Sequence, residues 1–313
     1  MTARRKKILL VVDGSYQSYE TVNYVSGVLP TSGTEMVLFH VASKVPEAFW
    51  DLEKDPAWQQ RVKTVRGWEI QQEKKIGEFM KRAHQVFTDA KFPKSSIKIK
   101  VCERKEGIAR DIGAESHRGY AAVILGRRGL STIQDLSLGG VASKVVLKVN
   151  DLAVWLVGGR PDPGGYLIGI DSSRGAMLAV NHVAVMTAGR GKKVLLLHVV
   201  RKVAGTIEEL ESPGMDTLQK ERTEKAVAEI EPVLREASER LRSGGLNAEN
   251  ISTKIVTEAS TRAGTIMEEA RAGGYGTIVV GRRGVSTVED FDMGRVTNKL
   301  VQTSKDRALW VVG

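Results

Sequence analysis

Glycines at a repeated spacing carry the clearest chemical signal in this sequence. Residues 126–140 and residues 281–295 each have glycine at the first and fourth positions, and a further glycine after nine more residues. Glycine lets the backbone approach a ligand closely and adopt positive φ. An apolar helical pattern follows each segment, at 141–149 and 296–301, and the free N–H groups of a helix N-terminus attract anions. The spacing therefore predicts a phosphate-binding loop in each segment.

An aspartate follows an apolar run in two places, at Asp13 and Asp171. A carboxylate repels phosphate, so each aspartate would instead accept hydrogen bonds from the base or ribose of a nucleotide. A second interpretation stays open, in which each aspartate caps the helix that follows it. The glycines likewise have a plainer interpretation as turn formers without a ligand.

Two arginines directly follow the first glycine of each segment, and their roles are open. Arg127, Arg128, Arg282 and Arg283 could clamp phosphates, stay as exposed loop charges, or bind acidic residues elsewhere in the chain. His40 and His198 end apolar runs and are interpreted as hydrogen-bonded core residues rather than bases. The other histidines lack the spacing of metal ligands, so no metal site is predicted. The single cysteine, Cys102, excludes an internal disulfide and is expected to be a buried thiol.

The elements that would position these residues occur twice in the chain. Four blocks of similar sequence recur in the same order at offsets of 155 to 158 residues, which indicates duplication of a whole domain. We expect domains at 1–158 and 166–313, joined by a Gly- and Pro-rich linker at 159–165. Short apolar runs, interpreted as strands, lie at 8–12, 36–42, 97–102, 121–125, 152–157, 166–170, 193–200, 251–256, 276–280 and 307–312. Helical patterns are clearest at 66–87 and 217–242.

Alternation of apolar runs with helical patterns predicts an α/β fold. The runs are nearly continuous, as expected for strands covered on both faces. Each half should form a doubly wound, five-stranded parallel sheet with helices on both faces, in which ligands bind outside the carboxyl ends of the strands. The two halves are expected to pair face to face through their last strands as an internal pseudo-dimer. A polar, Trp-containing stretch at 46–68 is expected to be a packed excursion from the first half, with a lid or an interaction surface as the alternatives.

Composition narrows the classes of function. Apolar residues make up 42% and charged residues 27% of the 313 residues, which is typical of a globular protein, and no apolar run approaches the length of a membrane span. The N-terminus lacks a signal-peptide pattern, so we expect a cytoplasmic protein. The first half holds most of the net charge of +10, with 25 Lys and Arg against 17 Asp and Glu in residues 1–158. No nucleic-acid-binding motif accompanies this charge, so an anionic small molecule is the favoured partner.

The duplicated pattern resembles a tandem member of the universal stress protein family. That family's nucleotide-binding members carry Gly-x2-Gly-x9-Gly-[Ser/Thr] after the fourth strand and an aspartate after the first. The resemblance implies an ATP site, with or without Mg²⁺, at the strand carboxyl ends of one or both halves, and places Val41 and Val199 beside adenine. The candidate ligand-binding residues are Asp13, Val41, Gly126, Arg127, Gly129, Gly139, Gly140, Asp171, Val199, Gly281, Arg282, Gly284, Gly294 and Arg295.

The sequence departs from the family motif at one position in each half. The binding Ser/Thr is replaced by Gly140 in the first half and by Arg295 in the second. Gly140 still offers a backbone N–H, whereas Arg295 could bind phosphate or fill the site, so the first half is favoured. No nucleophile elbow or Walker lysine is present, and catalytic residues are not predicted. The expected function is a nucleotide-dependent sensor or scaffold in the stress response, with at most slow hydrolysis. The alternative is a nucleotide-free scaffold that binds proteins or another acidic small molecule, and a further homodimer is compatible with either.

Overall fold

The computed structural model describes residues 6–130, 138–202, 215–285 and 292–313. In the first half, the strands are β1 (Lys6–Val11), β2 (Thr34–Ala42), β3 (Ile97–Glu103), β4 (Ala122–Gly126) and β5 (Ala153–Val157). The helices are α1 (Tyr16–Val28), α2 (Glu47–Trp50), α3 (Gln59–Asp89), α4 (Ile108–Ser116) and α5 (Gly140–Lys148), with short 3-10 turns η1 (Asp51–Lys54) and η2 (Lys94–Ser96).

The described part of the second half repeats this order. Its strands are β6 (Gly165–Gly169), β7 (Lys193–Arg201), β8 (Ile251–Ala259), β9 (Thr277–Gly281) and β10 (Ala308–Val312). Its helices are α6 (Arg174–Thr187), α8 (Met215–Ser243), α9 (Arg262–Ala272) and α10 (Arg295–Thr303), with the turn η3 (Ala248–Asn250). Each apolar run and helical pattern of the sequence corresponds to one of these elements. Parts of the two predicted phosphate-binding loops, residues 131–137 and 286–291, lie outside the described residues.

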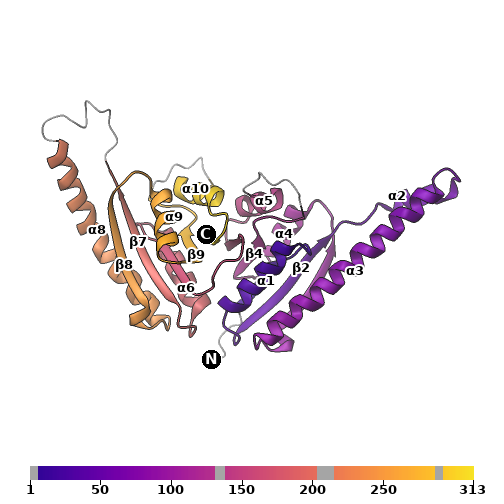
Figure 1. The fold of residues 1–313 in the computed structure, drawn as a ribbon, viewed down its shortest axis with the longest axis horizontal. Coiled ribbons are helices and arrows are strands. Elements are labelled where there is room, and N and C mark those ends of the chain that lie inside the picture. The colour runs from indigo at the N-terminus through magenta and orange to yellow at the C-terminus, as the bar shows by residue number, and fades with distance from the viewer. Residues whose placement is uncertain (1–5, 131–137, 203–214, 286–291) are drawn as a thin grey trace.

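All the described strands form one sheet, in the order β3-β2-β1-β4-β5-β10-β9-β6-β7-β8. Neighbouring strands are parallel within each half, and β5 pairs with β10 in the antiparallel direction. The α/β fold with two doubly wound halves is therefore confirmed. The halves meet edge to edge through their last strands, rather than face to face, so that the two strand edges satisfy each other (Figure 1).

Helices cover both faces of the sheet, and each face has one apolar core that runs across both halves. On one face, α1 and α3 of the first half and α6 and α8 of the second pack on the sheet. On the other face, α4, α5, α9 and α10 do so. Because residues of both halves contribute to each core, the two halves bury apolar surface together as one unit.

A buried tryptophan pair marks the centre of the seam. Trp155 of β5 lies opposite Trp310 of β10, and the rings stack with 3.6 Å between centroids and 6° between planes. The Trp310 indole N–H donates to the Tyr24 hydroxyl at 3.1 Å, and that of Trp155 donates to His182 Nε2 at 3.0 Å. Tyr24 lies on α1 and His182 at the equivalent place on α6, so the seam has approximate twofold symmetry.

Basic side chains at the seam also contact helix carboxyl ends of the opposite half. Lys6 Nζ donates to Val185 O near the end of α6, and Arg190 donates to Ser26 O and Leu29 O at the end of α1. The last carbonyls of a helix have no partner within the helix and carry its negative dipole end, so a cation there is favourable.

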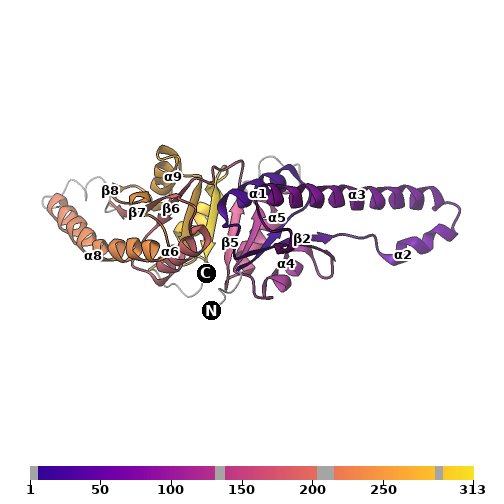
Figure 2. The ribbon, with the colours of Figure 1, turned by 90° about the horizontal axis from the view of Figure 1, so that it is seen from below.

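The stretch at 46–68 is not a packed excursion, as the sequence suggested, but part of an arm. It comprises α2, η1 and the beginning of α3, and it extends away from the sheet (Figure 2). Local contacts hold it, because Arg66 pairs with Glu53 at 2.9 Å and lies over the Trp50 ring, while Val62 is fully buried. The sequence expectation for Cys102 is also wrong: the thiol is only half-buried, because β3 is an edge strand.

Candidate functional site

The candidate residues gather at the carboxyl edge of the sheet in each half. Asp13 follows β1, Val41 lies near the end of β2, and Gly126 ends β4, with β1 between the other two strands. His40 Nδ1 donates to Val12 O at 2.8 Å, and His198 Nδ1 donates to Ile170 O at 2.7 Å. Both histidines thus fix the end of the neighbouring strand, just before the aspartate. Burial lowers the pKa of His198. These contacts agree with the interpretation of both histidines as core residues.

The Asp13 carboxylate contacts the chain itself on both sides. Its Oδ1 accepts from Ser18 Oγ at 2.6 Å and from Ser15 N at 3.0 Å, and its Oδ2 accepts from Leu130 N at 3.1 Å. The cap of α1 is Ser15, which accepts from Ser18 N at 3.1 Å, so Asp13 is not the cap. Asp13 instead connects the start of α1 to the glycine segment.

Asp171 makes the same connection in the second half. Its Oδ1 accepts from Ser173 N at 3.1 Å and from the Ser173 hydroxyl, and its Oδ2 accepts from Val285 N at 3.3 Å. Ser173 caps α6 by accepting from Ala176 N at 3.2 Å. The capping role of the two serines was not predicted from the sequence. Its signal was a serine two residues after each aspartate, just before a helical pattern.

None of the glycines in the two motifs has positive φ, so an unusual backbone conformation does not explain them. They instead allow neighbouring atoms to approach the backbone closely. A Cβ on Gly129 would overlap Asp13 Oδ2, and one on Gly284 would lie 2.6 Å from Asp171 Oδ2. These two glycines therefore let the aspartate reach the loop backbone. By contrast, a Cβ on Gly140 would have no neighbouring atom within 4 Å.

The remaining motif glycines sit against backbone or neighbouring side chains. A Cβ on Gly126 would lie 3.0 Å from Gln17, one on Gly281 would lie 2.5 Å from Gly175, and one on Gly139 would lie 3.2 Å from Arg127 O. Gly139 and Gly294 are the N-caps of α5 and α10. The prediction that each motif ends at a helix N-terminus thus agrees with the structure.

The valines assigned to adenine are mostly covered. Val41 is 5% exposed and Val199 is 4% exposed, and both belong to the core that includes α4, α5, α9 and α10. Little of either side chain is open to a ligand in this conformation.

Two of the four motif arginines are directed away from the loops that carry them. Arg127 and Arg282 are 1% and 5% exposed, so they are not exposed loop charges. Arg127 Nη2 donates to Val301 O of α10 at 2.5 Å. Arg282 donates to Val146 O at 2.9 Å and to Val149 O at 2.5 Å, at the end of α5. Each side chain therefore binds backbone carbonyls of the opposite half, which corrects the assignment of both as phosphate ligands.

The other two arginines and Arg295 face outward. Arg128 and Arg283 are exposed. Arg295 is the first residue of α10 and is exposed as well, so its side chain does not fill a cavity. The structure thus brings the aspartates, the glycines and the helix N-termini together, and directs the guanidinium groups of Arg127 and Arg282 to the opposite half.

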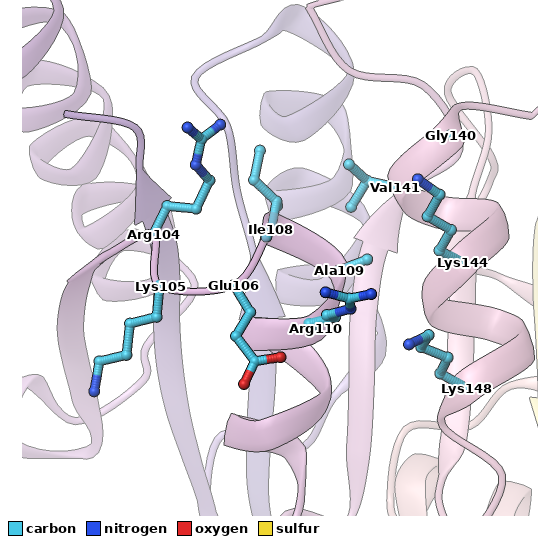
Figure 3. Close-up of a pocket in the computed structure, with 11 residues that line it drawn as sticks. Arg104, Lys105, Glu106, Ile108, Ala109, Arg110, Gly140, Val141, Lys144 and Lys148 are labelled. Carbon is cyan, nitrogen blue, oxygen red and sulfur yellow. The ribbon is translucent and has the colours of Figure 1, made fainter. Parts of the chain in front are cut away.

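A basic groove adjoins the motif in the first half. It has a volume of about 790 Å³ and lies between α4 and α5, reaching Gly140 and Val141 at the start of α5 (Figure 3). Five basic residues and one acidic residue line it: Arg104, Lys105, Arg110, Lys144, Lys148 and Glu106. Figure 3 shows Arg110 reaching from α4 toward α5, which presents Lys144 and Lys148 one turn apart. Within the described residues, none of the five cations forms an ion pair.

The second half does not repeat this charge. The ion pair Lys100–Glu115 has its counterpart in Lys254–Glu269, both at 2.7 Å, which fixes an offset of 154 between the α4 and α9 regions. With that offset, Arg104 and Arg110 correspond to Glu258 and Gly264. At the offset of 155 that relates α5 to α10, Lys148 corresponds to Thr303. Sequence reasoning missed the groove residues individually, although the charge excess of the first half was their signal.

Comparison with known families identifies the class of protein. The model of the universal stress protein family matches twice, over residues 4–154 and 166–310. The chain belongs to the universal stress protein family, as a tandem member with two copies of the family domain. No curated protein matches the chain.

Two solved structures that cover nearly the whole chain share its fold, and a third is similar to part of it. A universal stress protein from Archaeoglobus fulgidus DSM 4304 is 17% identical, with a TM-score of 0.54, over 100% of this chain and 99% of that one. A protein of unknown function from Pseudomonas aeruginosa PAO1 is 12% identical, with a TM-score of 0.53, over 98% and 92% of the two chains. A universal stress protein in complex with cAMP is 22% identical, with a TM-score of 0.34, and covers 48% of this chain and 95% of that one.

Two features are absent from the described residues. None of their helices combines the length and the hydropathy that a membrane span needs. Their His, Cys, Asp and Glu side chains form no group of three or more with the geometry of a metal site.

Proposed function

We propose that this chain is a stress-response protein that binds ATP at the carboxyl edge of its first half and acts as a nucleotide-dependent sensor or scaffold. The observation that carries the proposal is the basic groove that ends at Gly140. Five cations line it against one carboxylate, and a groove lined mainly by one sign of charge attracts ions of the opposite sign. The backbone N–H groups at the start of α5 add a second anion-binding element.

The groove fits the phosphate end of a nucleotide. Gly140 takes the place of the family hydroxyl, and the open space around it leaves room for a phosphate against the helix N-terminus. Arg110 and Lys144 are placed to neutralise a triphosphate that arrives alone or as its Mg²⁺ complex. The second half keeps a cation at Lys299 and gains one at Arg295, but Glu258, Gly264 and Thr303 replace Arg104, Arg110 and Lys148. Its positive charge there is lower, so a single site per chain is proposed.

Turnover is expected to be slow. The Asp13 carboxylate already accepts hydrogen bonds from three donors, so it is not free to act as the base that activates water. Occupancy of the site, rather than hydrolysis, would then alter the affinity for a protein partner.

A second candidate follows from the nucleoside end of the site. Asp13 already accepts hydrogen bonds from the chain, and Val41 is covered, so recognition of ribose and adenine requires these contacts to rearrange. A scaffold that binds another acidic small molecule in the same groove requires no such rearrangement. Further self-association, if it occurs, must use a surface other than β5 and β10, which already pair with each other.

Two substitutions at equivalent positions test the proposal. Gly140→Asp places a carboxylate at the start of α5, where it favours the helix but repels phosphate. Arg295→Asp places a carboxylate at the equivalent position of α10 and also removes a cation there. We expect wild-type protein to bind Mg-ATP in calorimetric titration, Gly140→Asp to weaken binding at least about tenfold, a loss of 1.4 kcal/mol, and Arg295→Asp to bind as wild type.

The outcomes separate the candidates. Absence of ATP binding by the wild-type protein contradicts the nucleotide proposal, and binding of inorganic tripolyphosphate without ATP binding supports the second candidate. Loss of ATP binding in Arg295→Asp alone moves the site to the second half.

A further inference from the structure

Arg127 is in contact with three elements that belong to both halves. Its N–H donates to Val157 O at the end of β5 at 2.8 Å, and its carbonyl accepts from Gly139 N, the cap of α5, at 2.7 Å. Its guanidinium crosses the seam to Val301 O in the last turn of α10 at 2.5 Å. One residue therefore connects the glycine loop of the first half to a helix of the second half.

Arg282 makes the reciprocal set of contacts. Its N–H donates to Val312 O at 2.6 Å, and its carbonyl accepts from Gly294 N, the cap of α10, at 2.9 Å. Its guanidinium binds Val146 O and Val149 O at the end of α5. Each helix that begins at one glycine loop is thus held at its other end by the arginine of the opposite loop.

The two reciprocal arginine–carbonyl contacts are expected to be rigid. The last carbonyls of α5 and α10 lack partners within the helix, and a cation there meets the negative end of the dipole. Hydrogen bonds from a charged donor are stronger than neutral ones, and both side chains are buried, so water does not readily replace them. Withdrawal of either guanidinium would leave buried carbonyls without donors, which is costly.

We propose that Arg127 and Arg282 are positioning residues that couple the two glycine loops mechanically. A displacement of Gly139, such as a ligand at the start of α5 would cause, moves the Arg127 backbone and is carried by its side chain to the end of α10, and from there to Gly294. Arg282 carries the reverse signal from the second loop to α5. This proposal rests on the proposed function only for the identity of the ligand. Because a coupling free energy is reciprocal, each loop affects the other equally.

Hydrogen exchange without any ligand tests the coupling. Gly139→Ala introduces a Cβ 3.2 Å from Arg127 O, whereas Gly140→Ala, one residue along the same helix, meets open space. Amides 300–305, in and after the last turn of α10, should exchange at least about fivefold faster in Gly139→Ala, and as in wild type in Gly140→Ala. Equal exchange of these amides in the two variants would overturn the proposal.

Arg127→Met distinguishes coupling from general destabilisation. By itself it should speed exchange of amides 300–305, and adding Gly139→Ala to it should produce no further change there. The exposed neighbour gives the control, because Arg128→Met should leave the Gly139→Ala effect intact. An effect of Gly139→Ala that persists in the Arg127→Met background contradicts the proposal.

If Gly139→Ala does not fold, hydrogen exchange in the presence of Mg-ATP provides a second test. Saturating Mg-ATP should change exchange of amides 300–305 in wild type and leave it unchanged in Arg127→Met that still binds ATP. If ATP binds wild type without altering these amides, the coupling is wrong and the proposed function stands. If ATP does not bind at all, the proposed function fails, and the ligand-free comparison of Gly139→Ala with Gly140→Ala decides the coupling. Unchanged exchange of amides 146–150 in Arg282→Met, relative to Arg283→Met, would also overturn the coupling.

Discussion

Trp155 donates its indole N–H to Nε2 of His182 at 3.0 Å, at the centre of the seam between the halves. An indole N–H can only donate, so Nε2 must be the unprotonated nitrogen of a neutral imidazole. Burial agrees with this, because it lowers the pKa of His182 to about 3. At the equivalent place on the other side of the seam, a Tyr24 hydroxyl receives the indole N–H of Trp310.

The neutral state of His182 predicts that the fold is sensitive to acid. In the unfolded chain the histidine titrates near 6.5, so below that pH the unfolded state binds a proton that the folded state does not. The stabilisation is complete above pH 6.5 and is lost as the pH falls toward 3, by at most about 1.4 kcal/mol per pH unit. His182→Gln, which keeps an acceptor for Trp155, should show a shallower dependence in urea unfolding between pH 7 and 4. His117→Gln, at an exposed site, serves as control, and equal slopes for the two variants would refute the assignment.

The contact between Asp13 and the glycine loop predicts strong coupling in a double-mutant cycle. A side chain at position 129 would overlap the Asp13 carboxylate, so Gly129→Ala should destabilise the wild-type protein much more than it destabilises Asp13→Ala. We expect an interaction free energy of about 1–2 kcal/mol by urea unfolding, within the range found for residues in contact. Gly140→Ala, with open space at its Cβ, should show additivity with Asp13→Ala. Additive effects at Gly129 would show that the loop is not held as described.

The stacked tryptophans predict that the two halves unfold together. Trp310 is fully buried and stacks on Trp155, so Trp310→Ala should lower the free energy of unfolding by about 3–5 kcal/mol. Near-UV and far-UV circular dichroism should still report a single transition, because each core spans both halves. Trp68→Ala on the exposed part of α3 is the control and should change stability by less than about 0.5 kcal/mol. Two separate transitions in the wild-type protein would contradict a shared core.

The strands and the duplication could be predicted because their signals are local. Residues 121–125 and 276–280 are nearly continuous apolar runs, and each is buried in the middle of one half's sheet. Repetition of the runs in one order predicted two equivalent sheets, and the structure adds that their last strands pair edge to edge. The helix at 66–87 was recognised, but α3 begins at Gln59 because the arm is held by contacts with Glu53 and Trp50 rather than by an apolar stripe on the body.

The roles of the motif residues could not be predicted in the same way. Arg127 and Val301 are 174 positions apart, and a backbone carbonyl leaves no mark in the sequence, so this arginine resembles any other loop charge. The contact of Asp13 with the glycine segment is likewise made to a main-chain amide, that of Leu130. The positive charge of the groove could be anticipated in part. The excess of Lys and Arg in the first half was visible in its composition, and five of these residues line the groove between α4 and α5.

The number of ATP molecules bound per chain tests the central claim most directly. Equilibrium titration of the full chain with Mg-ATP, with protein concentration determined independently, measures this number. The asymmetry between the groove at Gly140 and its counterpart at Arg295 predicts one site, which Gly140→Asp removes. Two equivalent sites, or none, would contradict the account.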